Sequence, residues 1–421
     1  MSLSLGVSSR RKISMVAVAA AAIAASACSA NMNSGTSPLS TSGSKVARAY
    51  SWSTWITVTP SPGAATEVTG INNLSPNPEI VGFYSKRISS IYSQSFSFTS
   101  FGPSYSPTTY ASYPRVHGGG KQTIPPMGTQ MNGIATQANA SQLPVLAGWV
   151  NQPGDQGGTW PVIDNQGLWA LEDNGKGGAT GDNGQTAELF GINDANIAVG
   201  CVTTSPATSA ITACSASDAN ANYFTVDGTP VAIQLQLTKS VSSSAAYGID
   251  DDGDMVGTAA LSNGNASWYA LCIKNCPTAG YSGSSTPSYC YATLNNGAYT
   301  STTTAYGIST SPAISGGAYL KLVVGYYTEG TGTAKVTHGF LTEVELNPST
   351  QGCEQIGTPQ TIDAPNSDKL TVVRGVNNDG YIVGYYINKK STQHQQVGFV
   401  AVPATTAKPR RTVRRIGDKA G

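Results

Sequence analysis

The sequence predicts an all-β protein, a six-bladed β-propeller of four-stranded repeats, each about 60 residues long and closed by the N-terminal strand. Three observations support this. A glycine-containing motif recurs six times, each copy has the pattern of short strands joined by tight turns, and the last copy lacks a strand that precedes the first. A β-solenoid or two β-domains remain as alternatives, because a propeller blade usually takes about 40 to 50 residues.

The repeated motif is clearest in residues 372–386, where Val-Val-Arg-Gly-Val-Asn-Asn-Asp-Gly is followed by Ile-Val-Gly-Tyr-Tyr. Its other copies lie at residues 68–84, 189–200, 246–257 and 305–327, with a weaker copy at 131–149. The first glycines of the copies are 57 to 68 residues apart: Gly70, Gly133, Gly191, Gly248, Gly307 and Gly375. A near-constant period of this kind indicates a repeat fold.

Each copy predicts β-strands. An apolar run, an Asn/Asp/Gly turn and an Ile-Val run together indicate a hairpin, because these turn residues tolerate left-handed backbone conformations. A third strand is expected at residues 267–271, 338–342 and 398–402, and a fourth at 361–365. We expect the two glycines of each copy to mark backbone bends or close strand approach.

The two ends of the array complement each other. The first copy is preceded by a strand-like segment at residues 56–59, and Pro60 lies ten residues before Gly70, as Pro365 lies ten before Gly375. The last copy stops after its third strand, at Val402. We therefore expect the N-terminal strand to complete the last sheet and so protect its edge.

Composition excludes one class of partner. Charged residues make up 11% of the 421 residues, against about a quarter in average proteins, and the formal net charge is +1. Binding to nucleic acid requires a clustered basic surface, so we expect no nucleic-acid partner. A hydrophobic content of 39% is sufficient for a folded core.

The N-terminal segment has the pattern of an export signal. A basic stretch at residues 10–12 precedes an apolar stretch at 13–25, and Ala25-Ser26-Ala27 supplies small residues before Cys28. We predict lipidation of Cys28 after removal of residues 1–27, with ordinary signal-peptidase cleavage as the alternative. The pair at Arg10 and Arg11 also permits twin-arginine export.

The remaining boundaries follow from composition. Residues 28–49 are rich in Ser, Gly, Asn and Thr and predict a flexible tether, 50–403 form the repeat domain, and 404–421 are a basic disordered tail. The predicted location is the cell envelope, as an outer-membrane or cell-surface lipoprotein, with a periplasmic or secreted protein as the alternative. We expect a monomer.

The other six cysteines fit an oxidising compartment, where an even number favours disulfides: Cys201, Cys214, Cys272, Cys276, Cys290 and Cys353. Cys201 and Cys214 would flank one loop and form the favoured pair. One of the three cysteines at residues 272–290 must pair with Cys353 if all six are bonded. A zinc site at Cys272 and Cys276 lacks a second ligand pair at matching spacing.

The motif at residues 375–386, together with His338-Gly339-Phe340-Leu341, resembles the bacterial "extracellular repeat, HAF family". That family is named for a His-Ala-Phe strand after a Gly-Ile-Asn-x-x-Gly-x-Ile-Val-Gly unit. The resemblance covers residues 305–402 best, and 56–84 and 189–257 less closely. It implies export and a β-repeat fold and no known activity.

Two segments contain candidate binding residues. Residues 83–113 set aromatic side chains among serines, as recognition surfaces do, and Tyr105, Tyr110 and Tyr113 are the ligand-binding candidates, whereas Phe96 and Phe98 fit a strand. The alternating carboxylates of Asp250, Asp252 and Asp254 resemble a calcium loop. These aspartates also lie at a hairpin tip, where such residues form turns, so calcium is only a weak cofactor candidate.

The sequence singles out no catalytic site. The three histidines, His117, His338 and His394, lack metal-ligand spacing, and the Gly-x-Ser-x-Gly element of esterases is absent. We therefore expect a non-catalytic binding or display platform for protein or glycan, anchored to the membrane by its lipid. The alternatives are a polysaccharide-active propeller enzyme, with carboxylates drawn from distant blades, and a purely structural envelope component.

Overall fold

The structure is a computed structural model in which the chain divides into residues 1–44 and 45–421. It describes only residues of the second part: 48–60, 63–75, 78–85, 94–98, 111–113, 129–136, 145–151, 159–164, 169–170, 187–203, 214, 219–224, 230–278, 281, 285–311, 320–347, 349–391 and 395–404. Cys28, residues 28–47 of the predicted tether and residues 405–421 of the predicted tail lie outside the described residues.

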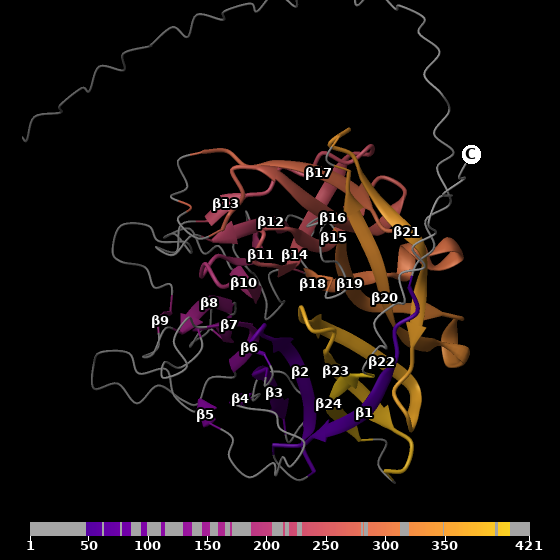
Figure 1. Ribbon diagram of the computed structural model, residues 1–421. Coiled ribbons are helices and arrows are strands. Elements are labelled where there is room, and N and C mark those ends of the chain that lie inside the picture. Colours follow the sequence, from indigo (N-terminus) through magenta and orange to yellow (C-terminus); the bar gives the residue numbers. More distant parts are fainter. Residues whose placement is uncertain are drawn as a thin grey trace, which may run out of the picture. The chain divides into compact units, whose positions relative to one another are not determined.

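The all-β prediction is confirmed, and the strands group into units of four (Figure 1). Unit 1 contains β2 (Ala65–Ile71), β3 (Ile80–Ser85), β4 (Gln94–Phe98) and β5 (Ala111–Tyr113). Unit 2 contains β6 (Thr129–Ala135), β7 (Val145–Asn151), β8 (Thr159–Asp164) and β9 (Trp169–Ala170). Unit 3 contains β10 (Ala187–Ile192), β11 (Ala198–Thr203), β12 (Ala219–Phe224) and β13 (Pro230–Ala232).

The later units have longer strands. Unit 4 contains β14 (Val241–Ile249), β15 (Met255–Leu261), β16 (Gly264–Lys274) and β17 (Ser288–Thr293). Unit 5 contains β18 (Thr304–Thr310), β19 (Leu320–Glu329), β20 (Val336–Leu346) and β21 (Cys353–Ile362), with short 3-10 helices η3 (Gly297–Thr302) before it and η4 (Gly332–Ala334) within it. Unit 6 contains β22 (Ser367–Val376), β23 (Ile382–Asn388), β24 (Gln396–Pro403) and β1 (Trp52–Val58).

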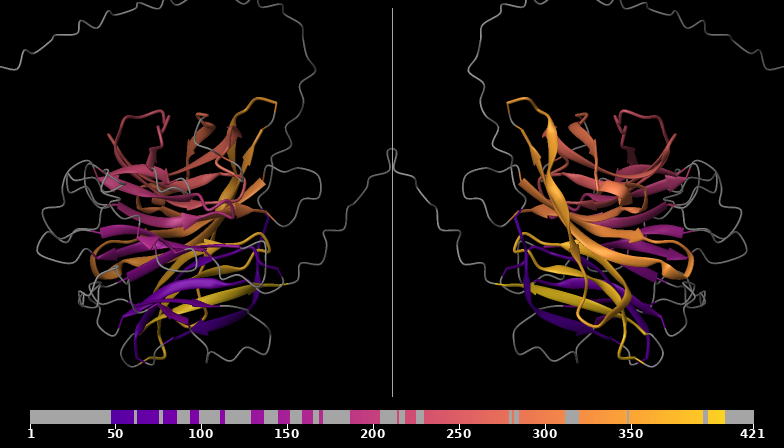
Figure 2. Two further views of the ribbon diagram at one scale, coloured as in Figure 1. Left: turned by 90° about the vertical axis from the view of Figure 1, so that its left-hand side faces the viewer. Right: turned by 90° about the vertical axis from the view of Figure 1, so that its right-hand side faces the viewer.

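The N-terminal strand completes the last unit, as its sequence predicts. β1 pairs antiparallel with β24, so that Ile56 lies opposite Val400 and Thr57 opposite Phe399. Figures 1 and 2 show β1, in indigo, beside the yellow strands of the C-terminal end. Units 5 and 6 belong to one eight-stranded sheet, but a single parallel bridge, between Thr337 and Leu370, joins them.

The first glycine of each motif permits neighbouring units to approach closely. A β-carbon on any of the first five would lie 3.0 to 3.3 Å from the α-carbon of the next first glycine along the chain. On Gly375 it would lie 3.6 Å from the carbonyl oxygen of Thr69, so the succession of contacts returns to unit 1. A larger side chain at these positions would push the innermost strands apart.

The second glycine of the motif is required for a different reason. In every unit the register between the first two strands shifts at the residue before the first glycine, which is a β-bulge. Opposite the bulge the strands approach so closely that a β-carbon on the second glycine would overlap a carbonyl oxygen of the first strand. This holds for five units, at Gly148, Gly200, Gly257, Gly325 and Gly384.

The asparagine of the motif holds the hairpin tip. In unit 3, Oδ1 of Asn193 accepts hydrogen bonds from the backbone N–H groups of Ala195 and Ile197. The equivalent residues of units 1, 4 and 6 do the same: Asn72, Asp250 and Asn377. The asparagine amide also bonds to the next unit, since Nδ2 of Asn193 donates to the carbonyl of Asp250 in unit 4.

Three disulfides connect the six described cysteines. Cys201 pairs with Cys214, the pair that the sequence favoured, and Cys272 pairs with Cys276. Cys290 pairs with Cys353 and so links unit 4 to unit 5. Disulfides of this number indicate an oxidising, extracytoplasmic environment. Within the described part, no helix has the length and apolar character needed to cross a membrane.

Candidate functional site

The bulged residues, one in each unit, form a layer next to the first glycines, where neighbouring units approach each other: Thr69, Asn132, Phe190, Tyr247, Tyr306 and Arg374. Four of them touch in succession. The rings of Phe190 and Tyr247 have centroids 4.9 Å apart, Tyr247 and Tyr306 are also 4.9 Å apart, and the Arg374 guanidinium lies 4.0 Å from the Tyr306 centroid. The other two bond to neighbouring backbone: Thr69 Oγ1 donates to the Met131 carbonyl and Asn132 Nδ2 to that of Leu189.

A cavity of about 950 Å³ opens beside this layer, within the range of about 300–1,000 Å³ typical of small-molecule sites. Its described lining comes mainly from units 4, 5 and 6, with Cys214 from unit 3, and is rich in tyrosine and hydroxyl groups. The tyrosines are Tyr247, Tyr306, Tyr326 and Tyr385, and serines and threonines supply most of the remaining polar surface. Flat aromatic faces among hydrogen-bonding groups suit a carbohydrate, whose rings have both apolar and hydroxylated surfaces.

The repeat places two carboxylates at equivalent positions of their units. The residues three positions before the first glycines of units 4, 5 and 6 are Ala245, Thr304 and Val372, and all three line the cavity. The equivalent residues of units 1, 2 and 3 are Glu67, Gln130 and Glu188. The strand register at this position is the same in all six units, so these three residues occupy equivalent places in their units.

Glu67 is held by two donors. Arg374 Nη2 lies 3.1 Å from Glu67 Oε2, and Gln396 Nε2 donates to Oε1 at 2.9 Å. The side chains of Glu67 and Arg374 are 15% and 19% exposed, so the ion pair is mostly buried. Arg374 also lies within 5.7 Å of the Tyr385 centroid, so the ion pair directly adjoins two tyrosines of the cavity wall.

Glu188 is more deeply buried, with 2% of the residue exposed. A carboxylate oxygen lies within 4.8 Å of the sulfurs of Cys201 and Cys214, and Cys214 lines the cavity. This group is not a metal-ligand set, because the sulfurs are joined in a disulfide and are not thiolates. The carboxyl group of Glu188 therefore lies close to Cys214, which is a residue of the cavity lining.

The cavity tyrosines are neutral hydrogen-bonding groups. Burial raises the pKa of Tyr306 well above its usual value, although the nearby Arg374 acts in the opposite direction. Burial likewise raises the pKa of Tyr247, whose hydroxyl is hydrogen-bonded to Thr258. Both side chains can therefore offer a hydroxyl and a ring face to a ligand at any ordinary pH.

The hairpin tips close the opposite end of the inner strands. The residues three positions after the first glycines are Asn73, Thr136, Asp194, Asp251, Thr310 and Asn378. Backbone N–H groups of five of them donate to the side chain of the equivalent residue in the next unit, at 2.5 to 3.0 Å. Asn73 Nδ2 also donates to Asp251 Oδ2 at 2.7 Å and so joins unit 1 directly to unit 4.

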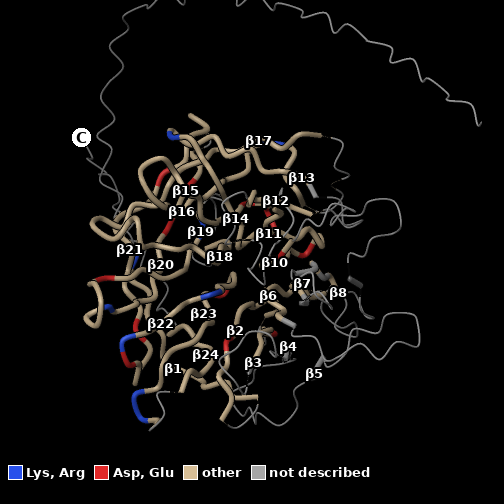
Figure 3. The backbone as a smooth tube through the Cα atoms, turned by 180° about the vertical axis from the view of Figure 1, so that it is seen from behind, with Lys and Arg blue, Asp and Glu red and all other residues tan. Residues whose placement is uncertain are grey.

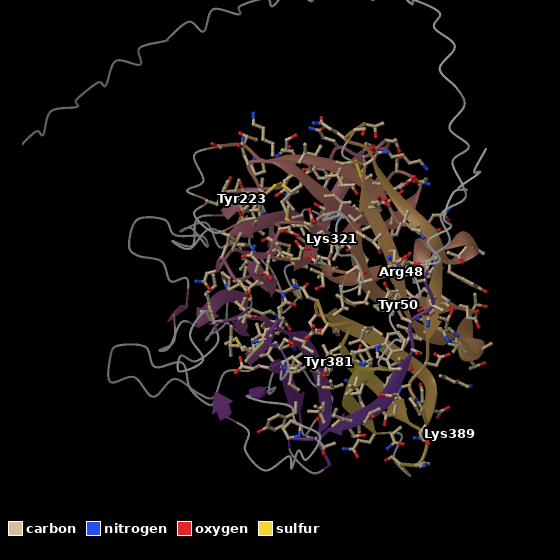
Figure 4. All side chains as sticks on the ribbon, in the orientation of Figure 1. Arg48, Tyr50, Tyr223, Lys321, Tyr381 and Lys389 are labelled. Carbon is tan, nitrogen blue, oxygen red and sulfur yellow. A yellow bond between two sulfur atoms is a disulfide. The ribbon has the colours of Figure 1, made fainter. Side chains whose placement is uncertain are left out.

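The calcium candidate contains a lysine. Nζ of Lys321, on β19, lies 2.7 Å from Asp250, 2.5 Å from Asp252 and 2.9 Å from Asp254. The side chains of Lys321 and Asp250 are each 3% exposed, and Figure 4 shows Lys321 deep within the fold. The ammonium thus lies among the three carboxylates that the sequence suggested as calcium ligands and neutralises part of their charge.

This cluster joins units 4 and 5. Asp250 stands where units 1, 3 and 6 have an asparagine, and a carboxylate cannot donate to the next unit as the asparagine amide does. Burial raises the pKa of Asp250 to about 7, against the opposing effect of Lys321. Burial alone would lower the pKa of Lys321, but Asp250 and Asp254 raise it above its usual value.

The raised pKa of Asp250 predicts a pH dependence of stability. The folded chain binds this proton more tightly than the unfolded chain, whose carboxyl has a pKa of 3.8. The contribution of Asp250 to the free energy of unfolding should therefore fall as the pH rises from about 4 to about 7, by at most about 1.4 kcal/mol per pH unit. Urea unfolding of Asp250→Asn across this range should show a flatter profile than the wild type.

The matched control is Asp379→Asn, at a half-buried tip position of unit 6, which should retain the wild-type profile. An Asp250→Asn profile parallel to that of the wild type would contradict the assignment of this proton to the cluster.

The structure leaves several predicted site residues undescribed. Tyr105, Tyr110, His117 and His394 lie outside the described residues, and of Tyr113 only the backbone, in β5, is described. His338, on β20, stacks on Tyr327 and its Nδ1 lies 2.8 Å from Asp363. It lies on an outer strand, away from the cavity lining.

Sequence reasoning missed Glu67, Glu188, Arg374 and Lys321. The two glutamates carry a signal, because alignment of the repeats on their first glycines places both at the same position. Lys321 is the one charge in the apolar run Leu-Lys-Leu-Val-Val, which favours a buried ion pair. Charges are sparse along the described backbone, so each of these is conspicuous (Figure 3).

No known family model matches the chain, and no curated protein matches it significantly. Among solved structures, an arabinanase from Bacillus subtilis is 8% identical, with a TM-score of 0.37, over 64% of this chain and 96% of its own. A mannose phosphorylase from Leishmania mexicana is 10% identical, with a TM-score of 0.34, over 84% and 89%. An aldose sugar dehydrogenase from Streptomyces coelicolor is 12% identical, with a TM-score of 0.36, over 85% and 100%.

These comparisons contradict the expected non-catalytic binding or display platform, because all three structures are named as enzymes that act on sugars. The expectation rested on the absence of a carboxylate pair from the sequence motifs, whereas the repeat register gives Glu67 and Glu188 equivalent positions in units 1 and 3. Identities of 8 to 12% leave the chemistry of this chain to its own residues.

Proposed function

We propose that this chain is an exported carbohydrate-active enzyme, a closed six-bladed β-propeller that hydrolyses glycosidic bonds in its central cavity. The pairing of β1 with β24 and the contacts that run from unit 6 back to unit 1 support the closed ring. In such a ring the innermost strand of every blade lines one central channel, and equivalent positions face one another across it.

The observation that carries the proposal is the placement of Glu67 and Glu188. They occupy the same position in β2 and β10, with Gln130 of β6 between them in the ring. Glycosidases use two carboxyl groups on either side of the bond that they cleave. The opposite side of the channel offers the tyrosines and hydroxyl groups needed to hold a sugar chain between them.

The environments of the two groups suggest different roles. Arg374 and Gln396 fix the orientation of the Glu67 carboxylate and suit it to act as an ionised base or nucleophile. Glu188 lies in a drier setting beside a disulfide and Tyr247, which suits a carboxyl that donates a proton to the leaving group. Tyr306 and Tyr385 would position the sugar against both.

The test is a screen of the mature protein on linear arabinan, β-mannan, xylan and amylose, with release of reducing ends as the readout. On the polymer that is cut, Glu67→Gln and Glu188→Gln should each lower kcat by about 10²- to 10⁴-fold, because each removes a proton-transfer or nucleophilic group. Melting curves should show that both variants still fold.

The matched control is Glu354→Gln, an exposed position on β21, which should retain full activity. Unchanged activity in both Glu67→Gln and Glu188→Gln would contradict the proposed site, and failure of the wild type on every polymer would contradict the proposed reaction.

We further propose that the enzyme belongs to the HAF-type extracellular repeat family and is anchored to the cell envelope by a lipid on Cys28. The motif at residues 375–386, the signal-like segment and the three disulfides support this. A palmitate label should enter the wild type and not Cys28→Ala, and fractionation should then find the variant released from the membrane. Equal labelling of the two would contradict the anchor.

A further inference from the structure

We propose that the channel is blind, so that the enzyme takes the end of a carbohydrate chain and releases its product through the mouth by which the chain entered. This rests on the proposed function and specifies it: the substrate is a chain terminus and not an internal segment. Two features carry the inference, the hydrogen-bonded closure at the hairpin tips and the position of the cavity at the other end of the same strands.

The closure is built from side chains that reach across and around the channel. Asn73 of unit 1 and Asp251 of unit 4 are joined at 2.7 Å, and in a ring of six these two units stand opposite each other. Asp251 Oδ1 also accepts from the Asp194 backbone at 2.9 Å, and Asn73 Oδ1 accepts from the Asn378 backbone at 2.9 Å. Asn73 and Asp251 are therefore each hydrogen-bonded to a unit next to their own as well as to each other.

These hydrogen-bonded hairpin-tip residues, here called the tip ring, are also held in place by contacts between units 4 and 5. Between units 4 and 5, Thr310 Oγ1 donates to Asp252 at 3.2 Å, and Lys321 binds both of these side chains. Burial and the neighbouring Asp251 raise the pKa of Asp194 to about 6, which shows how closely the acidic tips are packed. A polymer cannot pass through this end without breaking several of these bonds together.

The cavity lies at the opposite end of the inner strands. Its described lining includes residues 242–245, at the start of β14, and residues 301–304, which lead into β18. It also includes Leu370 and Val372 in the first half of β22. The tip ring follows the last residues of these same strands. One end of the channel is thus wide and hydroxyl-rich, and the other is closed.

A blind pocket differs from an open groove or tunnel in what it can bind. A groove accepts a chain at any internal position, and a tunnel lets it slide through, whereas a pocket with one opening admits only a terminus. The volume of about 950 Å³ also limits how much of a chain is enclosed at once. We expect removal of terminal units or short oligosaccharides, with the rest of the polymer left outside.

Two measurements test this on linear arabinan, β-mannan, xylan and amylose. During wild-type turnover, the viscosity of the polymer should stay near its starting value while short products accumulate from the first time point. Titration calorimetry of Glu188→Gln with fractions of different chain length should give one bound protein per chain, whatever the length.

A rapid fall in viscosity, or a stoichiometry that rises with chain length, would overturn the chain-end inference and leave the proposed enzyme standing. If none of the polymers is bound or cut, the proposed function fails and the chain-end inference fails with it. Flat viscosity together with one protein per chain supports both.

Discussion

Replacing Lys321 by methionine should lower the free energy of unfolding by about 3–5 kcal/mol, the cost of leaving buried charges without their partner. The substitution keeps an unbranched side chain one atom shorter than lysine and removes the ammonium from three carboxylates. Two of these, Asp250 and Asp254, have side-chain exposures of 3% and 6%, so water cannot replace the lost partner. Urea unfolding at pH 7.5 is the measurement.

The same variant should show a characteristic pH dependence. Loss of the ammonium should raise the pKa of Asp250 above its wild-type value of about 7, so the difference in stability between Lys321→Met and the wild type should shrink as the pH falls through about 7. A deficit due only to altered packing would not change with pH. That independence from pH would contradict the assignment of the loss to buried charge.

Lys389→Met is the matched control. Lys389 is exposed in the turn after β23, at the edge of the described part, whereas Lys321 lies deep within it (Figure 4). The control should change the free energy of unfolding by less than about 0.5 kcal/mol, as surface substitutions do. A similar loss of stability in the two variants would show that the lysine of the buried cluster contributes no more to the free energy of unfolding than an exposed lysine.

Removing β1 should abolish cooperative folding. Trp55 of this strand packs on Phe399 with ring centroids 4.9 Å apart, and Tyr50 and Trp52 pack against the same core. Without β1, that core and the hydrogen-bonding edge of β24 become exposed. The cost should be comparable with the whole stability of a typical domain, about 5–15 kcal/mol.

The comparison is between chains that begin at residue 48 and at residue 61. The longer chain keeps β1 and the preceding contacts, including the 2.6 Å hydrogen bond from Tyr50 to Glu343, and should melt like the full-length protein. The shorter chain should aggregate or melt without a cooperative transition. A cooperative transition at the wild-type temperature in the shorter chain would contradict the role assigned to β1.

The repeat explains how much of the fold could be predicted from sequence. Six glycine-centred copies and the missing strand after Val402 determine the strand order and the pairing of β1 with β24. They do so because glycine and the tip asparagine respond to local backbone geometry, which is the same in every copy. The β-bulge before the first glycine was not predicted, since a bulge becomes visible only when the partner strand is known.

The candidate site was largely missed for the opposite reason. A site in a repeat fold is assembled from positions about 60 residues or more apart, and each residue looks ordinary in its own copy. Glu67 and Glu188 stand out only when the six copies are aligned on their first glycines. Lys321 likewise becomes the partner of Asp250 only when unit 5 packs on unit 4.

The closed ring is tested most directly by cross-linking its two ends. Thr54 lies opposite Val402 in the β1–β24 pairing, within the reach of a disulfide. The double variant Thr54→Cys with Val402→Cys should form this bond on mild oxidation, and peptide masses without reduction should identify it. Thr54→Cys with Thr293→Cys, on β17 of unit 4, should not. Absence of the first bond, or equal formation of both, would contradict the closed ring and the central channel inferred from it.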